Sequence, residues 1–220
     1  MCRVQIIIMA GGIYHDFKEH KALTKINGER LIQRTIRLLK ENGVSFNDIF
    51  ISSNNPEFIK YGKVLRHENS FEAKNGIVKG YWLDAYYPTN KPTIYLHGDV
   101  YYTEEAIKKI LNYNAKENTF IGNEIARNPE HKNWGEPFGW IVVDQEKFRN
   151  DINKTKELQD KGLLDRGYAI SWELYRVMNN YDPNYMLIND NNYLVINDLT
   201  IDIDTPEQIE QVEKRIKGNL

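Results

Sequence analysis

The segment that most clearly indicates the fold of this chain is Val4-Gln5-Ile6-Ile7-Ile8-Met9-Ala10-Gly11-Gly12. Its apolar run lacks the alternation of a half-exposed strand, and such a run is typical of a strand buried on both faces of a parallel sheet. The two glycines that follow suit a tight turn, and they also let a phosphate chain approach the backbone amides. A strand that leads through such a loop into a helix predicts an α/β protein.

The rest of the chain repeats this alternation of strands and helices. We expect further strands at 49–52, 64–65, 93–96, 138–143, 193–196 and 201–204, and helices at 29–41, 76–84, 103–111, 147–161 and 171–178. The segment 147–161 is strongly charged, which favours an exposed helix or a lid. A last helix begins at Thr205, with Pro206 in its first turn and Gln208 completing a capping box. Its buried stripe is predicted to be Ile209, Val212 and Ile216.

The composition excludes several classes of protein. Lys and Arg number 29 against 31 Asp and Glu, so the formal charge of −2 gives no electrostatic case for nucleic-acid binding. The longest apolar run is far shorter than the ~20 residues of a membrane-spanning helix. Cys2 is the single cysteine, so an intramolecular disulfide is impossible. These features predict a cytoplasmic protein without a membrane or nucleic-acid partner.

Three short features could carry chemistry, and each also has a plain structural explanation. The first is the glycine turn followed by Lys21, which could fold back onto a bound phosphate. The second is Gly98-Asp99 after a central strand, where a carboxylate is well placed for Mg²⁺ but could equally cap a turn. The third is Asp202-Ile203-Asp204, whose carboxylates would share one strand face that could also be merely solvated. Ligands bind at the carboxyl ends of such strands, so the three together indicate a nucleotide–Mg²⁺ site.

These stretches resemble the motifs of the sugar-phosphate nucleotidyltransferase family. The family's opening motif is similar to Ile8 to Gly12 together with Lys21 to Ile32. Its metal motif is similar to Leu96 to Asp99, and its closing motif is similar to Asp202 to Ile209. The matches lie in order and span Ile6 to Ile209, whereas 69–87 and 123–192 match weakly. The resemblance implies a single α/β domain over 1–220 with a Rossmann-like, glycosyltransferase-A type fold, in which a mostly parallel mixed sheet is flanked by helices. The nucleotide-binding part would span about 1–120 plus 193–220, with an acceptor-binding insertion at about 121–192.

The resemblance also implies an activity and a set of site residues. Family members join a nucleoside triphosphate to a phosphorylated acceptor and release pyrophosphate, by positioning and charge neutralisation. Lys21 would be the catalytic residue, and Asp99 and Asp204 would hold Mg²⁺, with Asp202 as the alternative ligand. The nucleotide would be bound by Ala10, Gly11, Gly12, Lys18, Asn75, Gly76 and Gly98. The chain is closest in size to the compact cytidylyltransferases that act on phosphocholine, which favours CTP, and its product would enter a surface polysaccharide or lipid head-group pathway.

One departure from the family pattern concerns the segment after the glycines. The family usually has a further glycine and an arginine there, and Ile13 to Lys18 contains neither. Lys18, or protonated His15, could supply the missing positive charge. The departure also motivates a second hypothesis, in which a degenerate subunit binds nucleotide without turnover. A third hypothesis, a glycosyltransferase that uses a nucleotide-sugar, would need an Asp-x-Asp in mid-chain, where this sequence has Gly98-Asp99-Val100.

The acceptor site is predicted to come from the weakly matching insertion. Its candidate residues are basic or aromatic: Arg127, Lys132, Trp134, Trp140, Arg166 and Trp172. Aromatic rings there could stack on a sugar or enclose a quaternary ammonium such as choline. Each tryptophan could equally be a core residue, and the loop cations could simply be solvated.

Overall fold

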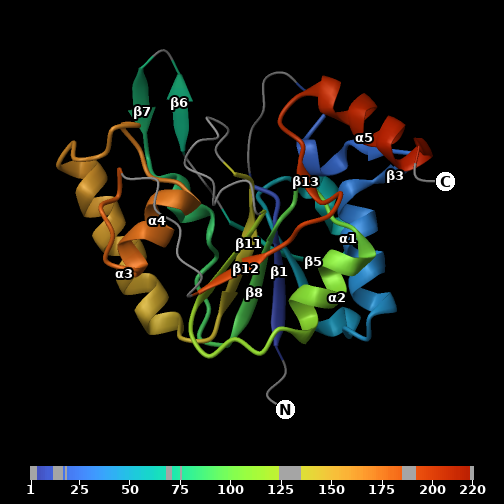
Figure 1. Cartoon of the computed structure of the whole chain (residues 1–220), viewed down its shortest axis with the longest axis horizontal. Helices are drawn as coiled ribbons and strands as arrows, with labels where there is room; N and C mark the ends of the chain where they lie inside the picture. Colours follow the sequence, from blue (N-terminus) through green and yellow to red (C-terminus); the bar gives the residue numbers. More distant parts are fainter. Residues whose placement is uncertain are drawn as a thin grey trace.

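The computed structural model describes residues 4–11, 17, 19–67, 71–74, 76–123, 135–184 and 192–218. A seven-stranded sheet in the order β12-β10-β11-β8-β1-β4-β5 forms the centre (Figure 1). Its strands are β1 (Gln5–Met9), β4 (Ile49–Ser52), β5 (Lys63–Leu65), β8 (Thr93–His97), β10 (Thr119–Gly122), β11 (Pro137–Val142) and β12 (Tyr193–Val195). All neighbours pair in parallel except β11, which is antiparallel to both β8 and β10. The predicted mixed, mostly parallel sheet is thereby confirmed.

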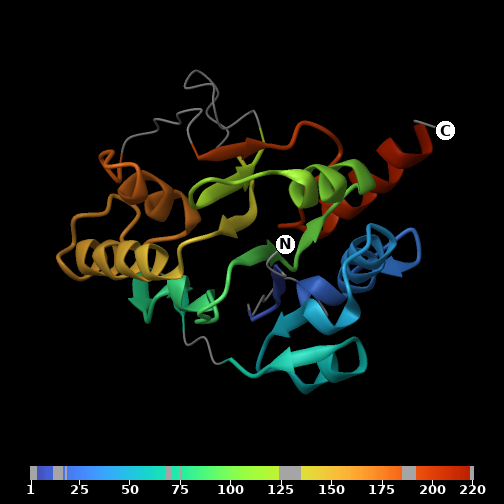
Figure 2. The same ribbon diagram turned by 90° about the horizontal axis from the view of Figure 1, so that it is seen from below.

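Helices cover both faces of this sheet, because its central strand is apolar on both sides. Successive side chains of a strand point to opposite faces. Ile6 and Ile8 accordingly pack into one buried cluster with α1 and α2, and Ile7 packs into another with α3 and α4. The bounds of these helices are α1 (Leu31–Glu41), α2 (Glu104–Asn112), α3 (Gln145–Asp160) and α4 (Ser171–Met178). Figures 1 and 2 show the two pairs of helices on opposite sides of the sheet.

The charged segment predicted as an exposed helix or a lid is the helix α3, and the idea of a lid is wrong. Phe148 and Ile152 are buried against Tyr95 and Trp140 of the sheet. Aromatic rings fill this layer, since the Phe148 centroid lies 5.4 Å from that of Trp140 and 5.9 Å from that of Tyr95. The charges lie on the other faces of the helix, so α3 is an amphipathic layer of the fold.

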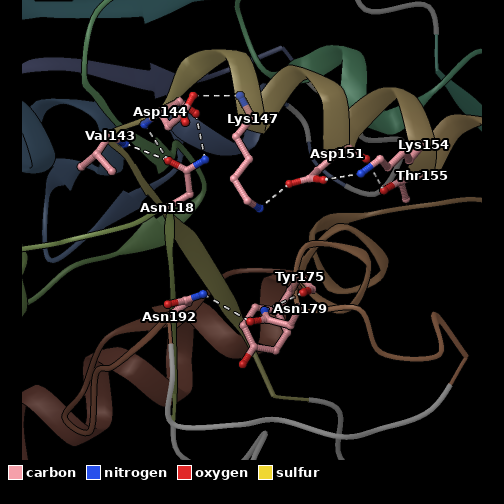
Figure 3. Close-up of polar contacts among 10 residues, drawn as sticks. All are labelled: Asn118, Val143, Asp144, Lys147, Asp151, Lys154, Thr155, Tyr175, Asn179 and Asn192. Carbon is pink, nitrogen blue, oxygen red and sulfur yellow. Dashed lines mark hydrogen bonds and ion pairs between the residues drawn. The ribbon is translucent and has the colours of Figure 1, made fainter.

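Side chains at the end of the sheet opposite to the glycine turn anchor α3 and α4 (Figure 3). The Asn118 side chain accepts hydrogen bonds from the amides of Val143 and Asp144 and donates one to the Asp144 carbonyl. Asp144 caps α3 by accepting from the Lys147 amide at 2.8 Å. Asn192 donates to the Asn179 side chain at 3.3 Å and so joins the entry of β12 to the end of α4.

The region predicted as a helix over 76–84 is instead a hairpin followed by one short helical turn. The hairpin pairs β6 (Glu72–Lys74) with β7 (Ile77–Lys79), and the turn is η4 (Trp82–Ala85). Gly76 and Gly80 both have positive φ, at 75° and 65°, which a right-handed helix does not allow. In Figure 1 the hairpin projects from the upper edge of the molecule.

The C-terminal segment returns to the glycine-turn edge of the sheet. A two-stranded ladder joins β13 (Ile201–Asp202) to β9 (Val100–Tyr101). The helix α5 (Pro206–Gly218) follows, and its predicted stripe of Ile209, Val212 and Ile216 packs on Ile26, Leu31 and Tyr101. The Gln208 side chain accepts from the Thr205 amide at 2.8 Å, as a capping box requires.

The remaining elements are short. They are β2 (Lys25–Ile26), β3 (Glu29–Arg30) and the 3₁₀ turns η1 (Lys21–Leu23), η2 (Phe46–Asp48) and η3 (Pro56–Lys60). Within the part of the chain that the structure describes, no helix has the length and apolar character needed to cross a membrane.

Candidate functional site

A cleft of about 570 Å³ opens where β1 and β8 end. The strand β1 runs upward in Figure 1 and ends at the upper edge of the sheet. Two contrasting walls enclose the cleft. The charged wall consists of Lys21, Asp99, Glu136, Asp202 and Asp204, and the aromatic wall consists of Phe71, Trp82, Arg166 and Trp172. Met9 and His97, the last residues of β1 and β8, form the floor between them. The cleft therefore lies where parallel α/β sheets bind their ligands.

Lys21 is the centre of the charged wall. It begins η1 and is 4% exposed, so its stem is packed and its ammonium group is held in place. Nζ donates to Asp204 Oδ1 at 2.8 Å and lies 3.8 Å from Asp99 Oδ2. The ring centroid of Phe17 lies 5.7 Å from Nζ. The lysine and the two aspartates predicted from distant motifs thus meet at one point.

Backbone hydrogen bonds explain why the two acidic motifs converge. The ladder between β13 and β9 places Asp202 opposite Val100, one residue beyond Asp99. The Ile203 amide then donates to the Asp99 carbonyl at 3.1 Å. This leaves Asp204 beside Lys21 with a side chain that is 62% exposed, whereas Asp202 is half-buried and its Oδ1 is shielded from solvent.

The charged wall has an excess of carboxylates, and its pKa values reflect this. Burial, followed by the charges of Asp99 and Asp204, raises the pKa of Asp202 well above its usual range. Its Oδ1 is buried and has no hydrogen-bond partner among the residues that the structure describes. Burial also raises the pKa of Glu136, whose Oε2 accepts from the Asp202 amide at 3.1 Å. A cation entering this wall would relieve the repulsion between these groups.

The donor set fits a hard divalent cation that also binds substrate. Mg²⁺ takes one or two protein carboxylates and completes its coordination with phosphate oxygens and water. Asp99 and Asp204 offer such a pair, with Asp202 as the alternative ligand. Within the described ranges no preformed group of three metal-ligating side chains occurs, so a cation here would depend on oxygens brought by a ligand.

The predicted glycine-turn residues differ in what they can offer a phosphate. Gly11 lines the cleft, and a Cβ there would meet nothing within 4 Å. The Ala10 amide already donates to the Ser52 carbonyl at 2.9 Å. Gly98 serves packing, because a Cβ would lie 2.5 Å from the Met9 carbonyl oxygen, and it does not line the cleft. Gly11 is therefore the described residue of this set that can face a ligand.

The aromatic wall is built on the start of α4 and the turn η4. The Trp172 ring centroid lies 4.8 Å from that of Phe120, and the residue lines the cleft although it is only 3% exposed. The Arg166 side chain is 31% exposed, and its Nε lies 3.6 Å from Oε1 of the buried Glu173. The same Glu173 oxygen lies 3.5 Å from Arg176 Nη1, and Oε2 accepts from the Ile170 amide at 2.9 Å. The buried carboxylate of Glu173 thus positions both arginines, Arg166 and Arg176.

His97 lies on the floor between the two walls. Its ring meets Trp82 edge to face, with centroids 5.9 Å apart. Burial lowers the pKa of the imidazole, with the Asp99 charge opposing, so the ring is biased to its neutral form. Its Nε2 is buried, and no described residue is its hydrogen-bond partner.

Not every predicted site residue reaches the cleft. Trp140 is fully buried against Phe120 and Phe148. It is a core residue, which was the alternative to the predicted acceptor role. Gly76 lies at the exposed turn of the β6–β7 hairpin and does not line the cleft. The following predicted positions lie outside the described residues: Gly12, His15, Lys18, Asn75, Arg127, Lys132 and Trp134.

The structure also adds residues that the sequence did not single out. Glu136 precedes an antiparallel strand, and the adjacent Gly135 and Pro137 are a weak signal of a functional turn. Trp82 was assigned to a helix that does not exist, and Phe71 precedes the hairpin. Since both belong to irregular segments, no periodicity marks them.

Comparison with solved structures identifies the fold. A CMP-2-keto-3-deoxy-manno-octonic acid synthetase in complex with CTP is 15% identical, with a TM-score of 0.56 over 99% of this chain and 100% of that one. The CTP:phosphocholine cytidylyltransferase of Streptococcus pneumoniae is 15% identical, with a TM-score of 0.53 over 97% and 99%. A Mycobacterium tuberculosis protein in complex with manganese is 13% identical, with a TM-score of 0.53 over 97% and 98%. This chain therefore has the nucleotidyltransferase fold, as the resemblance implied.

The sequence comparisons give no closer relative. No family model and no curated protein matches the chain.

Proposed function

We propose that this protein is an enzyme, a nucleotidyltransferase that joins a nucleoside triphosphate to a small phosphorylated acceptor and releases pyrophosphate. The observation that carries the proposal is the position of Lys21, buried between Asp99 and Asp204 at the carboxyl edge of the sheet. Three motifs far apart in the sequence supply these three groups. An ion pair needed only for stability would not require an open cleft beside it.

The reaction needs positioning and charge neutralisation rather than acid–base chemistry. A phosphate monoester is largely dianionic at neutral pH because its second pKa is near ~6, so it can attack without a general base. An oxygen of the acceptor phosphate forms a bond to the α-phosphorus, and the bond to the leaving pyrophosphate breaks in line. Lys21 would donate to the phosphate oxygens on which charge develops, and the Gly11 backbone would contact the triphosphate.

A divalent cation completes this proposal. Asp99 and Asp204 would hold Mg²⁺, with Asp202 as the alternative ligand, and the ion would offset the charge of the triphosphate. The manganese complex among the similar structures supports a divalent metal in this fold. Lys21 already pairs with both aspartates, so it would exchange part of that pairing for phosphate oxygens when substrate enters.

The aromatic wall is the proposed acceptor site. Arg166 is the cation of that wall nearest to solvent, and the Trp82 and Trp172 rings offer apolar surface to a small organic group. The other predicted acceptor residues, Arg127, Lys132 and Trp134, remain predictions. CTP is the proposed nucleotide, and two similar structures support it, since one is a CTP:phosphocholine cytidylyltransferase and the other is in complex with CTP.

The first experiment measures thermal stabilisation by CTP, UTP, GTP, ATP and dTTP, each with Mg²⁺ and with EDTA. A triphosphate at 100 times its Kd should add about 2.7 kcal/mol to the free energy of unfolding. We expect a Mg²⁺-dependent shift, largest for CTP, followed by pyrophosphate release when a phosphorylated acceptor is added. Binding without pyrophosphate release from any acceptor would favour the degenerate subunit. No shift with any triphosphate would contradict the proposal.

A further inference from the structure

One ring nitrogen on the floor of the cleft has an unmet hydrogen-bonding requirement. His97 is 6% exposed, and its Nε2 is shielded from bulk water without a partner in the described part of the chain. Leaving a buried polar atom unpaired costs about 1–3 kcal/mol. The ring borders the cleft, so a ligand is the group that can supply the missing partner.

The backbone around the ring decides which kind of partner Nε2 needs. His97 makes a hydrogen bond to the backbone of Pro137. Proline has no amide hydrogen, so its carbonyl accepts and a ring nitrogen of His97 donates. Nε2 is the nitrogen without a partner, so the donor is Nδ1. In a neutral imidazole with its hydrogen on Nδ1, Nε2 carries a lone pair and can only accept.

The position of His97 places this acceptor between the two walls. It is the last residue of β8, paired in register with Met9 of β1, and Gly98 and Asp99 follow it directly. Its other side meets the Trp82 ring. A ligand whose phosphates meet Lys21 would therefore bring the neighbouring part of its structure over His97.

We propose that His97 is a specificity-determining residue whose Nε2 accepts a hydrogen bond from a hydroxyl or N–H group of the ligand in the cleft. The inference rests on the proposed function. It assigns to the substrate a neutral hydrogen-bond donor close to its phosphate. A sugar or polyol phosphate carries such donors on the acceptor, and the ribose or an amino group carries them on the nucleotide.

The proposal separates two acceptor classes that the sequence left open. The trimethylammonium group of choline phosphate has no hydrogen to donate, so Nε2 would stay unpaired beneath it. A site that hydrogen-bonds a substrate group discriminates against analogues that lack the group, because its own polar atom is then left buried and unpaired. When the donor belongs to the acceptor, hydroxyl-bearing phosphates should therefore be preferred over choline phosphate.

The test compares the wild type with His97→Leu and His97→Gln. Leucine removes the acceptor, whereas the glutamine amide oxygen can restore one near the position of Nε2. Each protein is titrated with CTP, and its kcat/KM for pyrophosphate release is measured with glucose 1-phosphate, glycerol 3-phosphate and choline phosphate. Far-UV circular dichroism and the melting temperature establish that each variant is folded.

We expect His97→Leu to lower kcat/KM about 10- to 100-fold for the hydroxyl-bearing acceptors and to leave choline phosphate unaffected. His97→Gln should recover most of the loss. A loss confined to CTP affinity, again recovered by glutamine, would support the same chemistry with the nucleotide as its source. With CTP saturating, equal losses for all acceptors in folded variants would overturn the proposal. No loss in either acceptor kinetics or CTP affinity, or no recovery by glutamine, would also overturn it.

Failure of the proposed function gives a different result. If the wild type binds CTP and glucose 1-phosphate without releasing pyrophosphate, the proposed nucleotidyltransferase activity is refuted. The effect of His97→Leu on the affinity for each ligand, measured by calorimetry, would still decide the role of His97. A wild type that binds none of these ligands would overturn both proposals.

Discussion

The two walls of the cleft solve opposite physical problems. The charged wall brings four carboxylates around one lysine, and the pKa of Asp202 is raised as a result. The aromatic wall has few charges, and its cation, Arg166, pairs with the buried carboxylate of Glu173. Under the proposed function, the first wall would receive cations and phosphate, and the second would receive an organic group with a limited number of polar contacts. Chemistry and substrate choice would then be located on different sides of the cleft.

The largest expected effect comes from removing the central cation of the charged wall. Lys21→Met should lower kcat about 10³-fold, equivalent to about 4 kcal/mol of transition-state stabilisation, because it removes the donor to the developing phosphate charge. Pyrophosphate release at saturating substrates measures it. Lys108→Met is the matched control, since Lys108 also pairs with a carboxylate, Glu104 at 2.6 Å, but on an exposed helix face. Near-normal kcat in Lys21→Met would remove Lys21 from the mechanism.

The second prediction separates the carboxylates within the charged wall. Asp99→Asn should lower activity about 10²-fold and weaken the Mg²⁺ dependence, because it removes a ligand charge. The loss of activity in Asp202→Asn should be at least ten times smaller than in Asp99→Asn, since burial raises the pKa of Asp202 and so already favours its neutral form. Activity measured against Mg²⁺ concentration compares the two variants. Equal losses would show that Asp202 acts as a charged ligand.

The charged wall was predictable except for Glu136, because its other residues follow strands of the sheet or lie at the end of β13. Parallel strands end at one edge, so an acid after β8 and a lysine after β1 must approach each other wherever the strands pair. The sequence also marked Asp202 and Asp204, but alternation along a strand placed both on one face. In the structure β13 ends at Asp202, so the two carboxylates have different environments.

The aromatic wall was only partly predictable. Arg166 and Trp172 were singled out for their residue types, whereas Trp82 was assigned to a helix. The positive φ values of Gly76 and Gly80 are incompatible with that helix. The φ of a glycine cannot be predicted from the sequence, because glycine adopts positive and negative values about equally readily. Trp140 and Trp172 look alike in the sequence, and only tertiary packing separates the core ring from the cleft ring.

The third prediction concerns the cation of the aromatic wall. Arg166→Met should raise the KM for the acceptor about 10- to 30-fold with little change in CTP affinity, because the side chain borders the cleft on the acceptor side. The matched control is Arg149→Met, since Arg149 donates to the Thr89 carbonyl outside the cleft. Steady-state kinetics with the acceptor varied at fixed CTP measures the effect. A change confined to CTP affinity would reassign Arg166 to the nucleotide.

The smallest expected effect on catalysis distinguishes the two tryptophans. Trp140→Phe should lower the free energy of unfolding by roughly 1–3 kcal/mol, because the smaller ring leaves a gap among Phe120 and Phe148, and it should leave the acceptor KM unchanged. Trp172→Phe should change the acceptor KM several-fold, because that residue lines the cleft. Urea denaturation and acceptor kinetics on both variants give the comparison. A rise in acceptor KM for Trp140→Phe alone would move the acceptor site into the layer beneath α3 and would break the division between a charged and an aromatic wall.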